Sequence, residues 1–209
     1  MCVDDFCLNH ASMADFFKTL KAVSQGIYRE KMSRFLAFAE PVATADDARA
    51  VIKRYQNQYH DARHVCWAYM IGTAREEFLS SDNGEPSGTA GKPILGQINS
   101  FGLTNVVIVV VRYFGGIKLG TSGLIVAYRE AARLAIEAGE ILECHEQARR
   151  SFTFAYLTMN DVMKIVKKEQ VRIIEQHFDN VCSMTIEADA DAIPALVSLL
   201  KGAGASFQD

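Results

Sequence analysis

A run of β-branched residues, VVIVVV at 106–111, limits what this chain can fold into more than any other stretch. Side chains branched at Cβ favour strands, because they pack well on a pleated surface. The run has no polar residue, so it lacks the alternation typical of a strand with one solvated face. We therefore predict a strand over 105–113 that is buried on both faces.

Periodic segments around this strand predict a mixed α and β domain over 14–143. The stretch from Thr44 to Asp47 matches a capping box, with Asp in place of the usual Glu, and apolar residues follow it at helical spacing. Gly139 is expected to end the last helix of this domain. Strands are predicted over 25–30, 33–39 and 65–71, and helices over 45–59, 91–101 and 121–138.

A second domain is predicted over 150–209, where the pattern restarts. Phe152 and Phe154 alternate with small or polar residues, which is strand spacing. Asn160 and Asp191 are expected to cap two helices, and the resulting order βαββαβ is the ferredoxin-like arrangement. The polar stretch ECHEQARR is expected to join the two domains. The predicted fold class is therefore α+β with two domains.

Charge and composition restrict the function classes. The formal net charge is -3, so nucleic-acid binding would need a local basic patch rather than bulk charge. The sequence has no apolar run of about 18 residues, and Asp4 and Asp5 stand where a signal peptide would carry positive charge. Scattered cysteines without a CxxC pair indicate free thiols in a reducing compartment. We expect a cytoplasmic protein without membrane contact, with residues 1–12 as an extension.

The loop SDNGEPSGTAGKP, at 81–93, is too rich in glycine and proline for a buried helix or strand. A phosphate-binding P-loop is excluded, because Pro93 occupies the position of the Ser or Thr that holds magnesium and Pro86 replaces the first glycine. A dinucleotide fingerprint is absent here and in the second glycine-rich loop, GGIKLGTSG. We therefore predict no nucleotide cofactor, and no other cofactor.

The residues that could support acid/base or metal chemistry also have structural explanations. Asp82 and Glu85 could form an acid/base pair, but Asp-Asn-Gly-Glu-Pro is also good turn chemistry. His60 and His64 have the spacing of two metal ligands, yet the metalloprotease glutamate is missing and His64 falls in the next strand, so we predict no metal site. Cys66 lies in an apolar strand, where a buried and inert thiol is the usual outcome.

An anion-binding surface remains as a candidate site. Lys92 begins a helix, where free backbone N–H groups favour anions, and Arg112 ends the central strand. Lys118 lies in the second glycine-rich loop, and Thr121 and Ser122 begin the helix that follows it. Two such loops could bind phosphate or an RNA backbone. The alternative is that their glycines only let tight loops pass close to the sheet.

Three stretches together resemble the IMPACT family, in its bacterial YigZ-type branch: DARHVCWAYMIG, SDNGEPSGTAGKPIL and VVVRYFGGIKLGTSGLIVAYREAA. The resemblance covers about residues 14–140. Ser122 departs from the glycine expected there. The motif positions that match are Asp82, Gly84, Glu85, Pro86, Gly88, Thr89, Gly91, Lys92, Pro93, Arg112, Tyr113, Gly115, Gly116, Gly120, Thr121 and Gly123.

The resemblance implies a first domain similar to the second domain of ribosomal protein S-five, and a second domain similar to domain five of elongation factor G. It also implies regulation of translation, with RNA or ribosome binding and no established catalytic residues. We therefore expect a non-catalytic regulator that binds phosphates through Lys92, Arg112 and Lys118. Two alternatives stay open. One is an enzyme on a small phosphorylated or peptide substrate that uses Asp82, Glu85 and His64, and the other is a protein partner docked on the second domain.

Overall fold

The computed structural model describes residues 16–179 and 181–207. Contacts divide these residues into two compact units, a first unit over 16–144 and a second unit that begins at His145. The expected extension at 1–12 and the expected domain start at residue 14 lie outside the described residues. The α+β fold class with two domains is confirmed.

The first unit is built on a sheet in the order β2-β3-β6-β4-β5, and each neighbouring pair is antiparallel. The predicted central strand is confirmed as β6, and its residues from Val106 to Val111 are fully buried. A separate sheet pairs β1 (Phe16–Leu20) with β7 (Ile141–His145). The main sheet contains β2 (Ser24–Glu30), β3 (Ser33–Pro41), β4 (His64–Ile71), β5 (Glu77–Ser81) and β6 (Val106–Tyr113).

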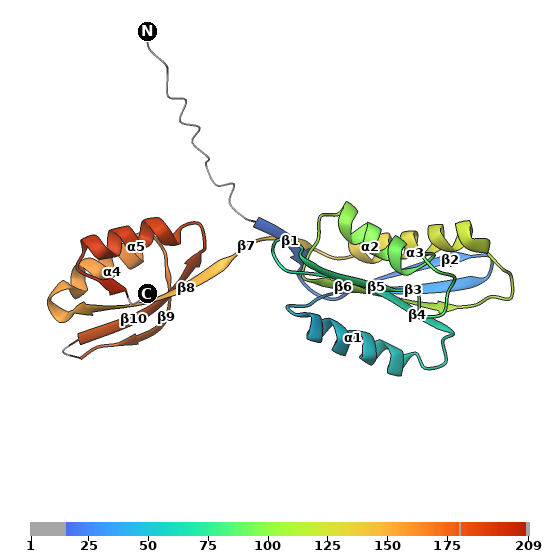
Figure 1. Ribbon diagram of the computed structural model, residues 1–209, viewed down its shortest axis with the longest axis horizontal. Helices are drawn as coiled ribbons and strands as arrows, with labels where there is room; N and C mark the ends of the chain where they lie inside the picture. The colour runs from blue at the N-terminus through green and yellow to red at the C-terminus, as the bar shows by residue number, and fades with distance from the viewer. Residues whose placement is uncertain (1–15, 180, 208–209) are drawn as a thin grey trace, which may run out of the picture. The chain divides into compact units, whose positions relative to one another are not determined.

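Helices cover both faces of this sheet, which explains why β6 needs no polar side chain (Figure 1). Helix α1 (Ala45–Gln58) packs on one face, against Val107 and its neighbours at alternate positions of β6. Helices α2 (Gly91–Ser100) and α3 (Gly120–Glu137) pack on the other face, against Val106, Ile108 and Val110. Burial of each such side chain contributes about 1.5–3 kcal/mol, so β6 is a major source of apolar stabilisation in the sheet.

Local sequence features set the ends of these elements. Thr44 caps α1: its hydroxyl accepts the backbone N–H of Asp47, and the Asp47 carboxylate accepts the backbone N–H of Thr44, each at 3.1 Å. The predicted capping box is therefore confirmed. Between β2 and β3, Lys31 and Met32 have φ values of 43° and 62°, the left-handed turn that matches the twist of a tight hairpin.

The second unit has the ferredoxin-like arrangement. Its sheet order is β11-β8-β10-β9, every pairing is antiparallel, and both helices pack on one face of it (Figure 1). The predicted order βαββαβ is therefore confirmed. The elements are β8 (Gln147–Ala155), α4 (Met159–Lys168), β9 (Arg172–His177), β10 (Val181–Asp189), α5 (Ile193–Gly202) and β11 (Ser206–Phe207).

Two predicted helix caps are wrong. A 3-10 turn over Tyr156–Thr158 leads directly into α4, so its N-cap is Thr158 and not Asn160. Helix α5 has Ala192 as its N-cap, which displaces Asp191 from that position. Neither helix has a side-chain hydrogen bond at its N-cap. Tertiary packing of their apolar faces therefore sets where these helices begin.

Three short strands were not predicted from the sequence. β1 and β7 form a two-stranded sheet, with one further bridge from Lys18 to Leu103, and β5 is an exposed edge strand, so none shows a clear apolar alternation. The predicted joining stretch, ECHEQARR, is itself mostly strand, because β7 ends at His145 and β8 begins at Gln147. Within the described residues, the helices are too short or too polar to span a bilayer.

Candidate functional site

Both glycine-rich loops border one cavity at one end of the first unit. The antiparallel register places His64, at the start of β4, opposite Arg112, near the end of β6. The chain leaves β6 at this end and enters α3 here, so the two loops meet. The cavity has a volume of about 430 Å³ and is lined by Arg63, His64, Glu85, Pro86, Arg112, Phe114, Lys118, Leu119, Gly120, Thr121 and Leu124.

Asp82 fixes the first loop from inside. Its carboxylate accepts the backbone N–H groups of Gly88, Ala90 and Gly91 at 2.7, 2.9 and 2.8 Å. Burial raises the pKa of Asp82, but these three donors outweigh it and hold the pKa below its ordinary value. The N-terminus of α2 is therefore already satisfied by a carboxylate of the same chain, and Asp82 is committed to positioning the loop.

Glu85 forms a buried ion pair beneath the cavity. Its Oε1 accepts Arg112 Nη1 at 2.6 Å and the Tyr128 hydroxyl at 2.8 Å, while only 3% of the Glu85 side chain is exposed. The Arg112 guanidinium lies over the rings of Phe35 and Phe114, at 5.5 and 5.4 Å from their centroids. Aromatic contact and the bidentate shape of guanidinium suit arginine to such a desolvated position.

His64 presents one ring nitrogen to the cavity. Its Nδ1 lies 2.9 Å from the carbonyl oxygen of Asn83. A carbonyl oxygen only accepts, so Nδ1 carries a proton and donates a hydrogen bond to it. Nε2 lies 4.0 Å from Glu85 Oε1, too far for a hydrogen bond. Among the described residues, His, Cys, Asp and Glu side chains do not gather in threes that could hold a metal ion. His64 and Glu85 therefore form a polar wall of the cavity, whereas the Asp82 carboxylate is bound to the backbone of its own loop.

Cys66 lies beside this network but is shielded from solvent. Its Sγ donates to the carbonyl oxygen of Asp82 at 2.9 Å and contacts the Tyr128 hydroxyl at 3.3 Å. Burial is the main cause that raises the pKa of the Cys66 thiol to about 12. The same burial, together with Cys66, raises the pKa of Tyr128 well above its ordinary value.

We expect Cys66 to resist alkylation in the native protein, because burial keeps its thiol protonated and shields it from the reagent. Iodoacetamide labelling followed by peptide mass spectrometry should modify Cys66 only in urea. Cys144, which is partly exposed, serves as the internal control and should react first. Equal labelling rates for the two thiols in native buffer would contradict this prediction.

The structure brings together three of the five residues expected to bind anions. Arg112, Lys118 and Thr121 line the cavity, although Arg112 is already paired with Glu85. Ser122 lines a separate depression beside Tyr28. Lys92 is exposed on the first turn of α2 and lies outside both linings. The charge available to a ligand in this cavity therefore comes from Lys118 and its neighbour Arg63.

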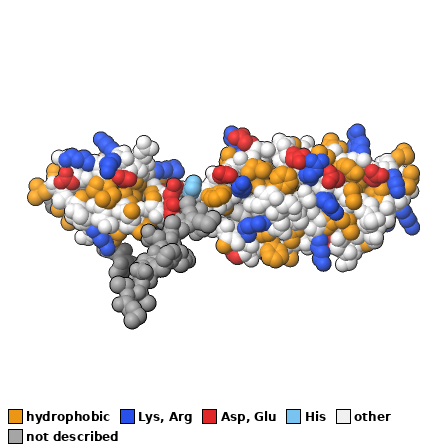
Figure 2. Space-filling view, turned by 90° about the horizontal axis from the view of Figure 1, so that it is seen from above, with side chains coloured by type: hydrophobic (Ala, Val, Ile, Leu, Met, Phe, Trp, Pro, Cys, Tyr) orange, Lys and Arg blue, Asp and Glu red, His pale blue; other side chains and the backbone are white. Residues whose placement is uncertain are grey.

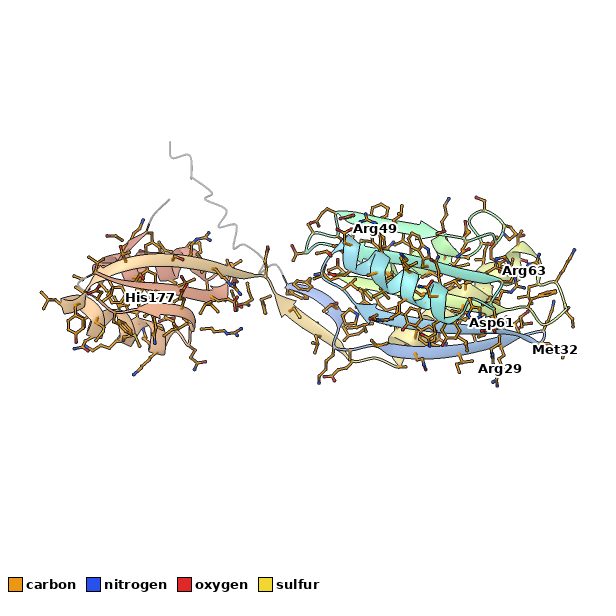
Figure 3. All side chains as sticks on the ribbon, turned by 90° about the horizontal axis from the view of Figure 1, so that it is seen from below. Arg29, Met32, Arg49, Asp61, Arg63 and His177 are labelled. Atoms are coloured by element: carbon orange, nitrogen blue, oxygen red, sulfur yellow. The ribbon has the colours of Figure 1, made fainter. Side chains whose placement is uncertain are left out.

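Further basic residues gather at this end and were missed in the sequence. The hairpin turn at Lys31 places Arg29 opposite Arg34, and β4 begins directly after Arg63. Figure 3 shows Arg29, Met32, Asp61 and Arg63 at this end, with Arg49 toward the other. Lysine and arginine side chains are also visible at the right-hand end of the unit in Figure 2. We call the exposed set the basic end: Arg29, Lys31, Arg34, Arg63 and Lys118.

The basic end carries unneutralised charge. Among the described residues, none of its five members forms an ion pair. Arg34 lies 5.0 Å from the centroid of the Tyr113 ring, and the Tyr113 hydroxyl donates to Asp61. Because the five cations come from three separate segments, only the strand register could have revealed them.

Comparisons with known proteins place both loops in a shared domain. A family model described as the Impact N-terminal domain matches residues 31–136. A Haemophilus influenzae protein named IMPACT family member is 34% identical over 187 residues, which are 84% of this chain and 89% of that protein. IMPACT family member YigZ of Escherichia coli is 42% identical over 100 residues, 47% of this chain and 49% of that protein. A crystal structure described as a hypothetical protein has a TM-score of 0.68 at 26% identity, covering 90% of this chain and 92% of that one.

Proposed function

Because the chain belongs to the IMPACT family, we propose that it is a cytoplasmic regulator of translation that binds RNA or the ribosome through its basic end. The observation that carries the proposal is the set of five exposed cations around the glycine-rich loops, which form no ion pair within the part of the chain that the structure describes. Phosphate contacts supply most of the affinity in non-specific nucleic-acid binding, and they need such free cations. The proposed role is binding and requires no reaction.

The exposed face of the sheet in the second unit favours the first unit as the one that binds RNA. Core residues such as Phe152 and Met184 alternate with residues that face away from the helices, and these are polar in the middle of the strands. This central patch, Ser151, Thr153, Ser183 and Thr185, offers hydroxyl groups. The patch itself has no Phe, Tyr or Trp ring of the kind on which bases stack in RNA-recognition domains, and the His177 ring lies opposite Ser183 at its edge.

Co-sedimentation with ribosomes across a salt series tests the proposal. The triple variant Lys31→Glu/Arg63→Glu/Lys118→Glu should bind at least about tenfold more weakly at low salt, and its salt slope should fall by about 0.7–0.9 for each lost phosphate contact. Arg112 is left intact, because reversing its charge would bury two carboxylates together.

A matched control separates position from net charge. Lys53→Glu/Lys164→Glu/Lys167→Glu changes the net charge by the same amount at residues of α1 and α4 that are not members of the basic end. This control should retain the affinity and salt slope of the wild type. Equal weakening of both triple variants, or unchanged binding by the basic-end variant, would rule out the proposed surface.

A further inference from the structure

We infer that the cavity at the basic end binds one nucleoside monophosphate unit, with its phosphate at the mouth and its base against the apolar wall. The inference goes beyond the proposed function, since an RNA backbone would run over exposed side chains whereas this ligand enters the cavity. It also stands without the ribosome, because it rests on the lining of the cavity alone.

The size and wall of the cavity suit a small organic molecule. Its volume of about 430 Å³ falls within the range of ligand pockets, about 300–1,000 Å³, and greatly exceeds that of a bare phosphate ion. Pro86, Leu119 and Leu124 provide an apolar surface, and the Phe114 ring is 44% exposed beside them. Stacking of a base on an aromatic ring stabilises binding by about 1–3 kcal/mol in single-strand-binding proteins, without sequence preference.

The mouth of the cavity suits a phosphate group. Lys118 lines it, and Gly120 and Thr121 begin the 18-residue helix α3 there. The N-cap of α3, Leu119, makes no side-chain hydrogen bond, and the first turn has no acidic residue. Its first backbone N–H groups therefore lack a side-chain acceptor, unlike those of α2, which Asp82 occupies.

Buried polar groups complete the site. The Arg112 side chain is 7% exposed and lines the cavity, and its Nε is buried without a hydrogen-bond partner among the described residues. The hydrogen bond from Nη1 to Glu85 and the two aromatic rings hold the guanidinium in place. His64 Nε2 has no hydrogen-bond partner within the described residues, so it can accept a hydrogen bond from a ligand. Native proteins rarely leave such groups unsatisfied without a functional reason.

The cavity has a cationic mouth, an aromatic wall and a polar floor. These features match the phosphate, the base and the sugar of a nucleoside phosphate. The anion meets Lys118, Arg63 and the α3 N–H groups, the base meets Phe114, and base or sugar hydroxyl groups meet His64. Two sources present this chemistry. One is a free nucleotide, and the other is the terminal nucleotide of an RNA that carries a 5′-phosphate.

Isothermal titration calorimetry of the full chain with adenosine 5′-monophosphate tests the inference at low salt. Thr121→Trp should block the mouth and abolish binding, whereas Ser122→Trp, its exposed neighbour outside the cavity, should retain wild-type affinity. Lys118→Glu should weaken binding at least about tenfold, and Lys92→Glu should leave it unchanged. Far-UV circular dichroism checks that all four variants fold.

Competition by short RNAs distinguishes the two sources. If the site takes an RNA terminus, a 5′-phosphorylated oligonucleotide should displace the monophosphate and a 5′-hydroxyl oligonucleotide should not. If the site takes a free nucleotide, neither should compete. Either result supports the inference, provided that Thr121→Trp abolishes the binding.

Three results would overturn the inference. The first is no binding of either the monophosphate or the 5′-phosphorylated oligonucleotide. The second is equal binding by Thr121→Trp and Ser122→Trp. The third is binding of adenosine or of inorganic phosphate as tight as that of the monophosphate. Ribosome co-sedimentation of Thr121→Trp tells the two hypotheses apart, because this variant keeps every cation of the basic end.

Discussion

Replacing Arg112 by methionine is expected to lower the free energy of unfolding of the first unit by about 3–5 kcal/mol. The variant leaves Glu85 charged and buried, with the Tyr128 hydroxyl as its one remaining side-chain donor among the described residues. The double variant Arg112→Met/Glu85→Gln should recover most of this loss, because a neutral amide oxygen can still accept from Tyr128. Urea unfolding followed by fluorescence measures the effect. Trp67, the chain's single tryptophan, lies on β4 and reports on this unit alone.

Arg34→Met is the matched control. Arg34 lies at the same end of the sheet but is exposed and unpaired with any carboxylate described, so its loss should change the stability by less than about 0.5 kcal/mol. A double variant as unstable as Arg112→Met alone would show that packing of the guanidinium, and not the buried charge, carries the effect.

Asp82→Ala is expected to lower the free energy of unfolding by about 2–4 kcal/mol near pH 7, since three backbone N–H groups lose a charged acceptor. The effect should depend on pH. The folded pKa of Asp82 lies below its ordinary value of 3.8. At pH values between the folded pKa and the ordinary value, the unfolded chain therefore binds more protons than the folded chain. The contribution is therefore complete above about pH 5 and is lost as pH falls through the folded pKa.

Urea midpoints of wild type and Asp82→Ala, measured between about pH 7 and pH 2, should therefore converge in acid. Asp46→Ala is the control, because Asp46 is an exposed residue of the first turn of α1 and its side chain is 90% exposed. Its effect should stay within about 0.5 kcal/mol at every pH. A constant gap between wild type and Asp82→Ala down to the lowest pH would contradict the role given to the carboxylate.

Elements with strong periodicity could be predicted from the sequence, and weakly patterned ones could not. The uninterrupted apolar run identified β6, and the Thr44 capping box located α1. β5 escaped because Phe78 and Leu79 are exposed on an edge strand, where pairing with β4 rather than burial defines the strand. The Asn160 and Asp191 caps failed because packing shifted the start of each helix by one or two residues.

Site residues were predicted by type but not by partner. The glycine-rich loops and Lys118 could be found from composition, yet the bond between Glu85 and Arg112 joins residues 27 positions apart. Nothing local in the sequence connects them, since Glu85 lies in the loop after β5 and Arg112 on β6, two strands that flank β4 in the sheet. Sequence reasoning therefore assigned Arg112 to a ligand, whereas in the structure its charge is largely met by Glu85.

The position of β6 has a consequence for synthesis of the chain. β6 lies between β3 and β4, although it follows both in the sequence. The β2–β3 and β4–β5 hairpins can form early, but their inner edges have no partner until residue 113 has been translated. Exposed edges beside apolar side chains invite pairing between nascent chains. The strand whose side chains are buried on both faces of the finished sheet thus also determines how long a growing chain is exposed to aggregation.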